Sequence, residues 1–196
     1  MPAFRFNAYQ HEYIDAATNE VLPHITGLLK ADGLVDDRWF KKEHSERGRV
    51  VHTLTADYDL GAITDIASVV SEGKGYLAGH VKAMAILRPE WLHVEVPFVH
   101  WGHRFGGRPD RVGRVDGGWA VLDVKSGVKT PAAPVQTALQ AILMEPELKV
   151  PARSILRFVL YLSKDGKFKL LRHTDPRDFD RAYRILKERY NEARAA

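Results

Sequence analysis

GRPDRVGRVDGGWAVLDVKSG occupies residues 107–127. Asp116-Gly117-Gly118 forms a turn signal in its middle, and the runs 111–115 and 119–124 on either side have the composition of short strands. The stretch therefore predicts a β-hairpin. Because the second run is apolar and an alanine-rich segment follows it, we expect this strand to lie inside a sheet rather than at its edge.

Three polar residues of this hairpin are expected to meet at one end. Side chains alternate between the two faces of a strand, so Asp123 and Lys125 share one face. If the chain turns at Gly117, Asp110 pairs with position 124 or 125 and returns beside them. Two carboxylates at a strand end suit Mg²⁺, which binds carboxylates, waters and phosphate oxygens. A neighbouring lysine can hold or deprotonate a water, or neutralise charge on phosphorus, so the group predicts phosphodiester hydrolysis.

These residues resemble the signature of the PD-(D/E)xK nuclease superfamily, with Pro109-Asp110 followed by Asp123-Val124-Lys125. The run 122–127, LDVKSG, is similar to the RecB-like exonuclease branch of that superfamily. Gly48 to His52 resembles the upstream G-x-x-x-H motif of the branch, and Glu95 resembles its acidic residue on the preceding strand.

The resemblance extends into the segment after the lysine. Gln136 falls where the branch carries a glutamine on the following helix, whereas Gln140 stands where a tyrosine is usual. Together the matching motifs span roughly residues 24–144. They imply an α/β chain with a restriction-endonuclease-like core, in which a central mixed β-sheet is flanked by helices.

The resemblance also implies a role for each matching residue. The metal, Mg²⁺ or Mn²⁺, would be held by His52, Glu95, Asp110, Asp123 and the backbone carbonyl of Val124. The catalytic residues would be Asp110, Asp123, Lys125 and Gln136. In the nuclease hypothesis, the backbone groups around Ser126 and Gly127, together with Arg108, Arg111 and Lys129, would hold the flanking phosphates. From the residues alone, His52 borders an apolar helix stripe, and a lone histidine in that position is more often a core residue than a metal ligand.

The function that the resemblance implies is metal-dependent DNA exonuclease activity in phage-type recombination or in DNA repair and processing. DNA is then the expected partner, and a single-strand annealing protein is a candidate second partner. A structure-specific endonuclease is the main alternative, distinguished by whether circular DNA is cut. A non-catalytic nucleic-acid-binding module is disfavoured because Asp110, Asp123 and Lys125 are all present. A hydrolase of small phosphates lacks the support of a Walker-type glycine motif.

Composition sets further limits. With 196 residues and 45% hydrophobic content, we expect one domain, with a mostly helical part over 1–90, a catalytic sheet and helix over 91–175 and a C-terminal helix over 176–196. The absence of cysteine excludes disulfides, zinc–cysteine sites and iron–sulfur clusters.

Apolar runs fall short of the ~18 residues of a membrane span and the N-terminus lacks a signal-peptide pattern, so we expect a cytoplasmic protein without a membrane partner. The net charge is +4, and the basic excess lies in residues 101–196, which favours a phosphate-binding face. No motif sets the oligomeric state.

Periodicity and turn residues predict the other elements. In chain order they are a small hairpin within 3–22, a helix from Thr26 to Lys30, a long helix from about Asp36 to Leu60 with Trp39 and Phe40 on its apolar side, a helix over 64–87 weakened at Gly73 and Gly75, strands over 91–101 and 104–108, a helix over 134–144 ended by Pro146, strands over 154–162 and 168–171, and a helix over 176–194.

Overall fold

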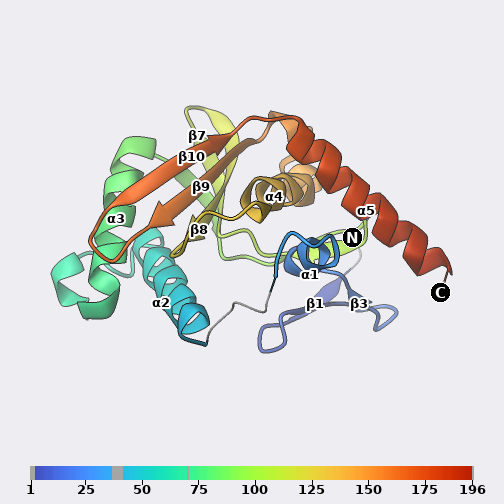
Figure 1. Cartoon of the computed structure of the whole chain (residues 1–196), viewed down its shortest axis with the longest axis horizontal. Helices are drawn as coiled ribbons and strands as arrows, with labels where there is room; N and C mark the ends of the chain where they lie inside the picture. The colour runs from blue at the N-terminus through green and yellow to red at the C-terminus, as the bar shows by residue number, and fades with distance from the viewer. Residues whose placement is uncertain (1–2, 37–41, 70, 196) are drawn as a thin grey trace.

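A five-stranded mixed sheet forms the centre of the computed structural model, which describes residues 3–36, 42–69 and 71–195 (Figure 1). Its strands, in spatial order, are β10 (Phe168–His173), β9 (Leu156–Leu162), β8 (Gly118–Lys125), β7 (Arg111–Val115) and β4 (Glu90–Val94). β8 and β9 pair in parallel, and the other neighbours pair antiparallel. The predicted α/β fold with a central mixed sheet is confirmed.

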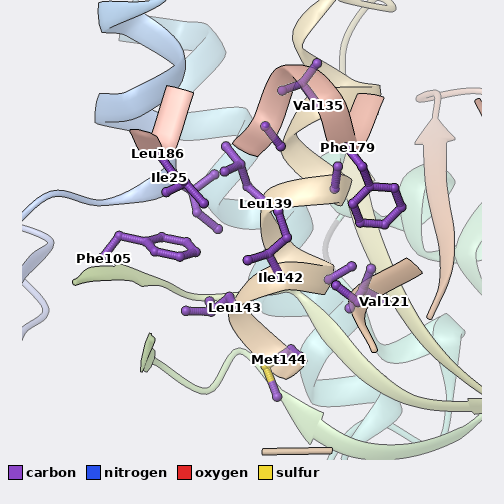
Figure 2. Close-up of a cluster of buried hydrophobic side chains, with 14 of the residues drawn as sticks. Ile25, Phe105, Val121, Val135, Leu139, Ile142, Leu143, Met144, Phe179 and Leu186 are labelled. Atoms are coloured by element: carbon purple, nitrogen blue, oxygen red, sulfur yellow. The ribbon is translucent and has the colours of Figure 1, made fainter. Parts of the chain in front are cut away.

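Helices cover both faces of this sheet. They are α1 (Ile25–Ala31), α2 (Lys42–Asp59), α3 (Ser71–Leu87), α4 (Ala132–Leu148) and α5 (Arg177–Ala195), with short 3-10 turns at Ile66–Ser68 and Ala152–Ser154. Side chains of α1, α4 and α5 share one core cluster with Val112 and Val121, and Figure 2 shows this cluster around Leu139. Side chains of α2 and α3 share a second cluster with Leu122 and Val124 on the opposite face.

β8 is an interior strand with buried apolar residues on both faces of the sheet. Val121 belongs to the α4 side and Leu122 to the α2–α3 side, and both are fully buried. The alternation predicted for this strand is therefore confirmed. It carries Asp123 and Lys125 to the α4 side of the sheet, where they meet side chains from that helix.

The hairpin of β7 and β8 turns one residue earlier than predicted. Val115 pairs with Gly118, so Asp116 and Gly117 alone form the turn, both with positive φ (50° and 77°). Such a two-residue turn matches the twist of paired strands. The register Arg111–Leu122 follows, which places Asp110 opposite position 123 rather than the predicted 124 or 125.

The predicted single strand over 91–101 is wrong, because the chain divides at Glu95. β4 ends at Val94 and joins the main sheet, whereas β5 (Phe98–His100) pairs with β6 (Phe105–Gly107) in a separate two-stranded sheet. Glu95 has φ 53° and Pro97 follows it, so neither residue suits the interior of a strand. The segment 104–108 therefore does not continue the main sheet.

Several boundaries also differ from expectation. Gly73 and Gly75 do not weaken α3: a Cβ at either position would collide with Leu54 or with the carbonyl of Lys164, so glycine permits close packing there. Pro146 lies inside α4, which continues to Leu148. α1 begins after His24, so Thr26 is not its cap.

The remaining segments complete the chain. The N-terminal hairpin gains a third strand, and the sheet consists of β1 (Phe4–Asn7), β2 (Glu12–Asp15) and β3 (Val21–Leu22). Trp39 and Phe40, predicted on the long helix, lie outside the described residues. Within the described ranges, no helix has both the length and the apolar content needed to span a membrane.

Candidate active site

Asp110 lies at the junction of the two halves of the site. It immediately precedes β7 and is 6% exposed. Its Oδ2 accepts the backbone N–H of Val124 at 2.6 Å, which fixes the carboxylate against the end of β8. Its backbone carbonyl accepts the N–H of Glu95 at 3.0 Å. A bend after β4, the start of β7 and the end of β8 are thus tied together at one residue.

His52, Glu95 and Asp110 form a cluster of three potential metal ligands. His52 Nδ1 lies 3.0 Å from Glu95 Oε1 and 3.4 Å from Asp110 Oδ1. One ligand atom from each residue lies within 4.8 Å of the other two. The residues come from α2, from the bend after β4 and from the start of β7. This convergence agrees with the sequence prediction that a distant histidine joins the two acids.

Asp123 and Lys125 form a second group with α4. Lys125 Nζ lies 2.9 Å from Asp123 Oδ2 and donates to Gln136 Oε1 at 3.0 Å. The Gln136 amide donates to Asp123 Oδ1 at 2.7 Å, and Gln140 Nε2 donates to the same oxygen at 3.2 Å. Among the described residues, the three-residue metal cluster does not include Asp123, whose carboxylate contacts the lysine and the two amides.

Burial and charge together set the protonation of both groups. Burial raises the pKa of Asp123, and Asp110 nearby raises it further, against the effect of Lys125. Burial alone would raise the pKa of Asp110 as well, but the charge of His52 lowers it to about 2. The same charge pair, with Asp110 as the main cause, raises the pKa of His52 to about 10. Burial opposes the charge of Lys125, yet Asp123 and Asp110 raise its pKa. Each buried carboxylate thus has a cation beside it, His52 from α2 for Asp110 and Lys125 from the same strand for Asp123.

The predicted phosphate-binding residues separate into two kinds. Ser126 and Lys129 lie on the loop after β8, and Lys129 is exposed. Its pKa is lowered by the neighbouring Lys169 of β10, which marks a local concentration of positive charge. Arg108 is partly exposed and its Nε lies 3.2 Å from Glu95 Oε2.

The structure corrects the role predicted for Arg111. The prediction that it holds DNA phosphates is wrong for this structure, because its side chain is fully buried and bonded to Asp59 and Thr55. The residue belongs to β7, whose other buried positions are apolar or glycine, so composition alone did not separate it from its exposed neighbours Arg108 and Arg114.

Sequence reasoning missed the residues around Arg111 and left the role of Gln140 open. Thr55 and Asp59 follow His52 at spacings of three and seven, which places all three on one face of α2. A run of polar residues on the buried side of a helix was the available signal. Gln140 stands where the family branch usually carries a tyrosine, and the structure shows that its side chain is 2% exposed and donates to Asp123.

The mixed sheet thus carries a cluster of three potential metal ligands beside the Asp123–Lys125 pair, an arrangement suited to a hydrolase. The family described as PD-(D/E)XK nuclease superfamily matches residues 11–196, and the chain belongs to it. A solved structure from Eubacterium rectale, described as a "Putative exonuclease", is similar over 85% of this chain and 71% of its own, at 11% identity and a TM-score of 0.48. Comparison with curated proteins gives no match.

Proposed function

We propose that this nuclease is a metal-dependent DNA exonuclease of the RecB-like, phage-type branch, acting in recombination or in DNA repair and processing. The observation that carries the proposal is the meeting of two groups at the end of β8. The His52–Glu95–Asp110 cluster offers metal ligands, and the Asp123–Lys125–Gln136 group offers a fixed cation beside a buried carboxylate. Asp110 joins the groups through the N–H of Val124.

The donor set fits a divalent cation. One imidazole nitrogen and carboxylate oxygens suit Mn²⁺, and the carboxylates also suit Mg²⁺. In our proposal His52, Glu95 and Asp110 hold the ion, and Asp123 and the carbonyl of Val124 complete its shell. When bound, such an ion polarises a phosphoryl oxygen and lowers the pKa of a water. Because the three clustered donors lie within 4.8 Å of one another, they require little rearrangement to share one ion.

Lys125 and Gln136 supply what the carboxylates cannot. Lys125 Nζ is held between Asp123 Oδ2 and Gln136 Oε1, so its positive charge has a defined position at the strand end. A fixed cation there positions a water or neutralises charge that develops on the phosphate. Gln136 bonds both partners of the pair and therefore sets their orientation.

DNA would enter along the basic side of the site. Lys129 and Lys169 are exposed neighbours, and Ser126 lies on the same loop as Lys129. Arg108 lies beside Glu95 of the metal cluster. Phosphate contacts of this kind release counterions, so binding should weaken as salt rises.

The decisive test compares linear and covalently closed circular DNA incubated with Mg²⁺, Mn²⁺ or EDTA, followed by end-label analysis of the products. We expect linear DNA to be degraded from its ends in either metal, circles to persist and EDTA to stop the reaction. Cutting of circles at a comparable rate would instead identify a structure-specific endonuclease. Absence of cleavage with either metal would contradict the nuclease site itself.

A further inference from the structure

A buried polar network lies behind the proposed metal cluster. It consists of Thr55 and Asp59 on α2, His80 on α3 and Arg111 on β7. The side chains of Thr55, His80 and Arg111 are fully buried, and that of Asp59 is 4% exposed. None of the four belongs to the motifs that carry the family resemblance. Because their side chains are buried, DNA in solution cannot contact them in this arrangement.

Arg111 is the centre of this network. Its Nε donates to Asp59 Oδ2 at 2.5 Å, and its Nη2 donates to Thr55 Oγ1 at 3.1 Å. His80 Nε2 lies 2.9 Å from each oxygen of Asp59, so the carboxylate is engaged by two cationic or polar groups. Asp59 therefore links α3 to α2 through His80, and Arg111 links α2 to β7.

The remaining side of the guanidinium faces the metal cluster. Arg111 Nη1 donates to the backbone carbonyl of Asp110 at 2.7 Å and lies 3.7 Å from Glu95 Oε1. The same carbonyl accepts the N–H of Glu95, whose φ of 53° is a conformation that a non-glycine residue rarely adopts. Arg111 thus touches both acids of the cluster, and Thr55 donates to the backbone carbonyl of His52 at 3.2 Å.

Stability alone is a weak reason to bury such a pair. Removing two charges from water is costly, and apolar replacements of a buried ion pair are often equally stable or more so. Left-handed backbone at a non-glycine residue is likewise maintained by its surroundings. Both features lie next to the potential ligands, which indicates that the network serves their geometry.

We propose that Arg111, backed by Asp59, Thr55 and His80, is a positioning residue that holds Glu95 and Asp110 in the arrangement required for metal binding. The inference rests on the metal site proposed above. The competing interpretation is a purely structural pin that joins α2 and α3 to the sheet. The two interpretations differ in what is lost when the charges are removed but the fold is kept.

The test is calorimetric titration of Mn²⁺ into folded, DNA-free protein, with a thermal melt of each variant. The main variant combines Arg111→Met with Asp59→Asn, which removes both charges and leaves an amide oxygen for His80. We expect Mn²⁺ affinity to fall on the order of 10-fold or more, as for other residues that orient metal ligands, while the melting temperature stays within a few degrees. Arg111→Lys keeps the charge but loses the fork of donors. This variant should therefore retain only part of the wild-type Mn²⁺ affinity.

The chain offers a matched control in Arg157 and Asp178. This arginine is likewise buried, at 2% exposed, and its Nη2 lies 3.0 Å from Asp178 Oδ2, but it bonds the start of α4, which carries none of the three clustered ligands. Arg157→Met with Asp178→Asn should leave Mn²⁺ affinity unchanged.

The outcomes separate the inference from the proposed function. Wild-type protein that binds no Mn²⁺ would refute the metal site. Wild-type binding with equal affinity in the folded Arg111→Met, Asp59→Asn variant would overturn the positioning role alone. If that variant does not fold, Arg111→Lys decides, because it keeps the charge and loses the fork of donors: a loss of about threefold or more in Mn²⁺ affinity supports the role, and unchanged affinity overturns it.

Discussion

Gln136→Leu tests whether the bridge between Asp123 and Lys125 matters for cleavage. The glutamine donates to Asp123 at 2.7 Å and accepts from Lys125 at 3.0 Å, and each hydrogen bond to a charged group contributes about 1.5–3 kcal/mol. Because the direct Asp123–Lys125 contact at 2.9 Å survives the change, we expect to lose the equivalent of about one such bond. At about 1.4 kcal/mol per tenfold, the rate should fall on the order of 10- to 100-fold.

Single-turnover degradation of end-labelled linear DNA at saturating Mg²⁺ measures this rate. Gln140→Leu is the matched comparison on the same helix. Gln140 makes one longer bond to Asp123, and its Oε1 is buried with no hydrogen-bond partner among the described residues. We expect Gln140→Leu to reduce the cleavage rate less than Gln136→Leu does. Because the change also removes a buried oxygen that has no partner in the described part of the chain, thermal stability should be unchanged or raised. A Gln136→Leu rate within twofold of wild type, in a protein with a normal melt, would refute the bridging role.

Three further predictions concern other parts of the molecule. Lys125→Ala should reduce the cleavage rate on the order of 10²-fold or more, and near-wild-type digestion by the folded variant would remove the lysine from the site. His52→Ala should weaken Mn²⁺ binding and Mn²⁺-supported activity more than Mg²⁺-supported activity, because imidazole suits Mn²⁺ better; equal Mn²⁺ affinities by calorimetry would exclude His52 as a ligand. Burial raises the pKa of Tyr13, so its stabilising effect is complete below the unfolded pKa of about 10 and is lost as pH rises above it. Tyr13→Phe should therefore flatten the loss of stability above pH 10 in urea titrations, and an unchanged slope would contradict this cause.

The sequence was most informative where local pattern and chemistry coincide. The hairpin, its interior strand and the shared face of Asp123 and Lys125 follow from alternation and from one turn signal. The convergence of His52 and Glu95 on Asp110 was expected from the family resemblance, since their wide separation in sequence carries no local signal.

The errors arose where tertiary contacts override local pattern. Glu95 alternates like a strand residue, but its backbone turns left-handed and its N–H pairs with Asp110, which no alternation rule anticipates. Arg111 looks like any arginine of a basic segment, and only the position of Asp59 on a helix far away in sequence makes it a core residue. The exact hairpin register depended on which two residues adopt positive φ.

The parallel pairing of β8 with β9 has a consequence for synthesis of the chain. Every residue of the proposed site, from His52 to Gln136, leaves the ribosome before β9 (Leu156–Leu162) does. Until β9 arrives, the strand that carries Asp123 and Lys125 has an unpaired apolar edge, and such edges promote aggregation. A chain truncated after α4 would thus contain every residue of the proposed metal site while one edge of the strand that carries Asp123 and Lys125 remains unpaired.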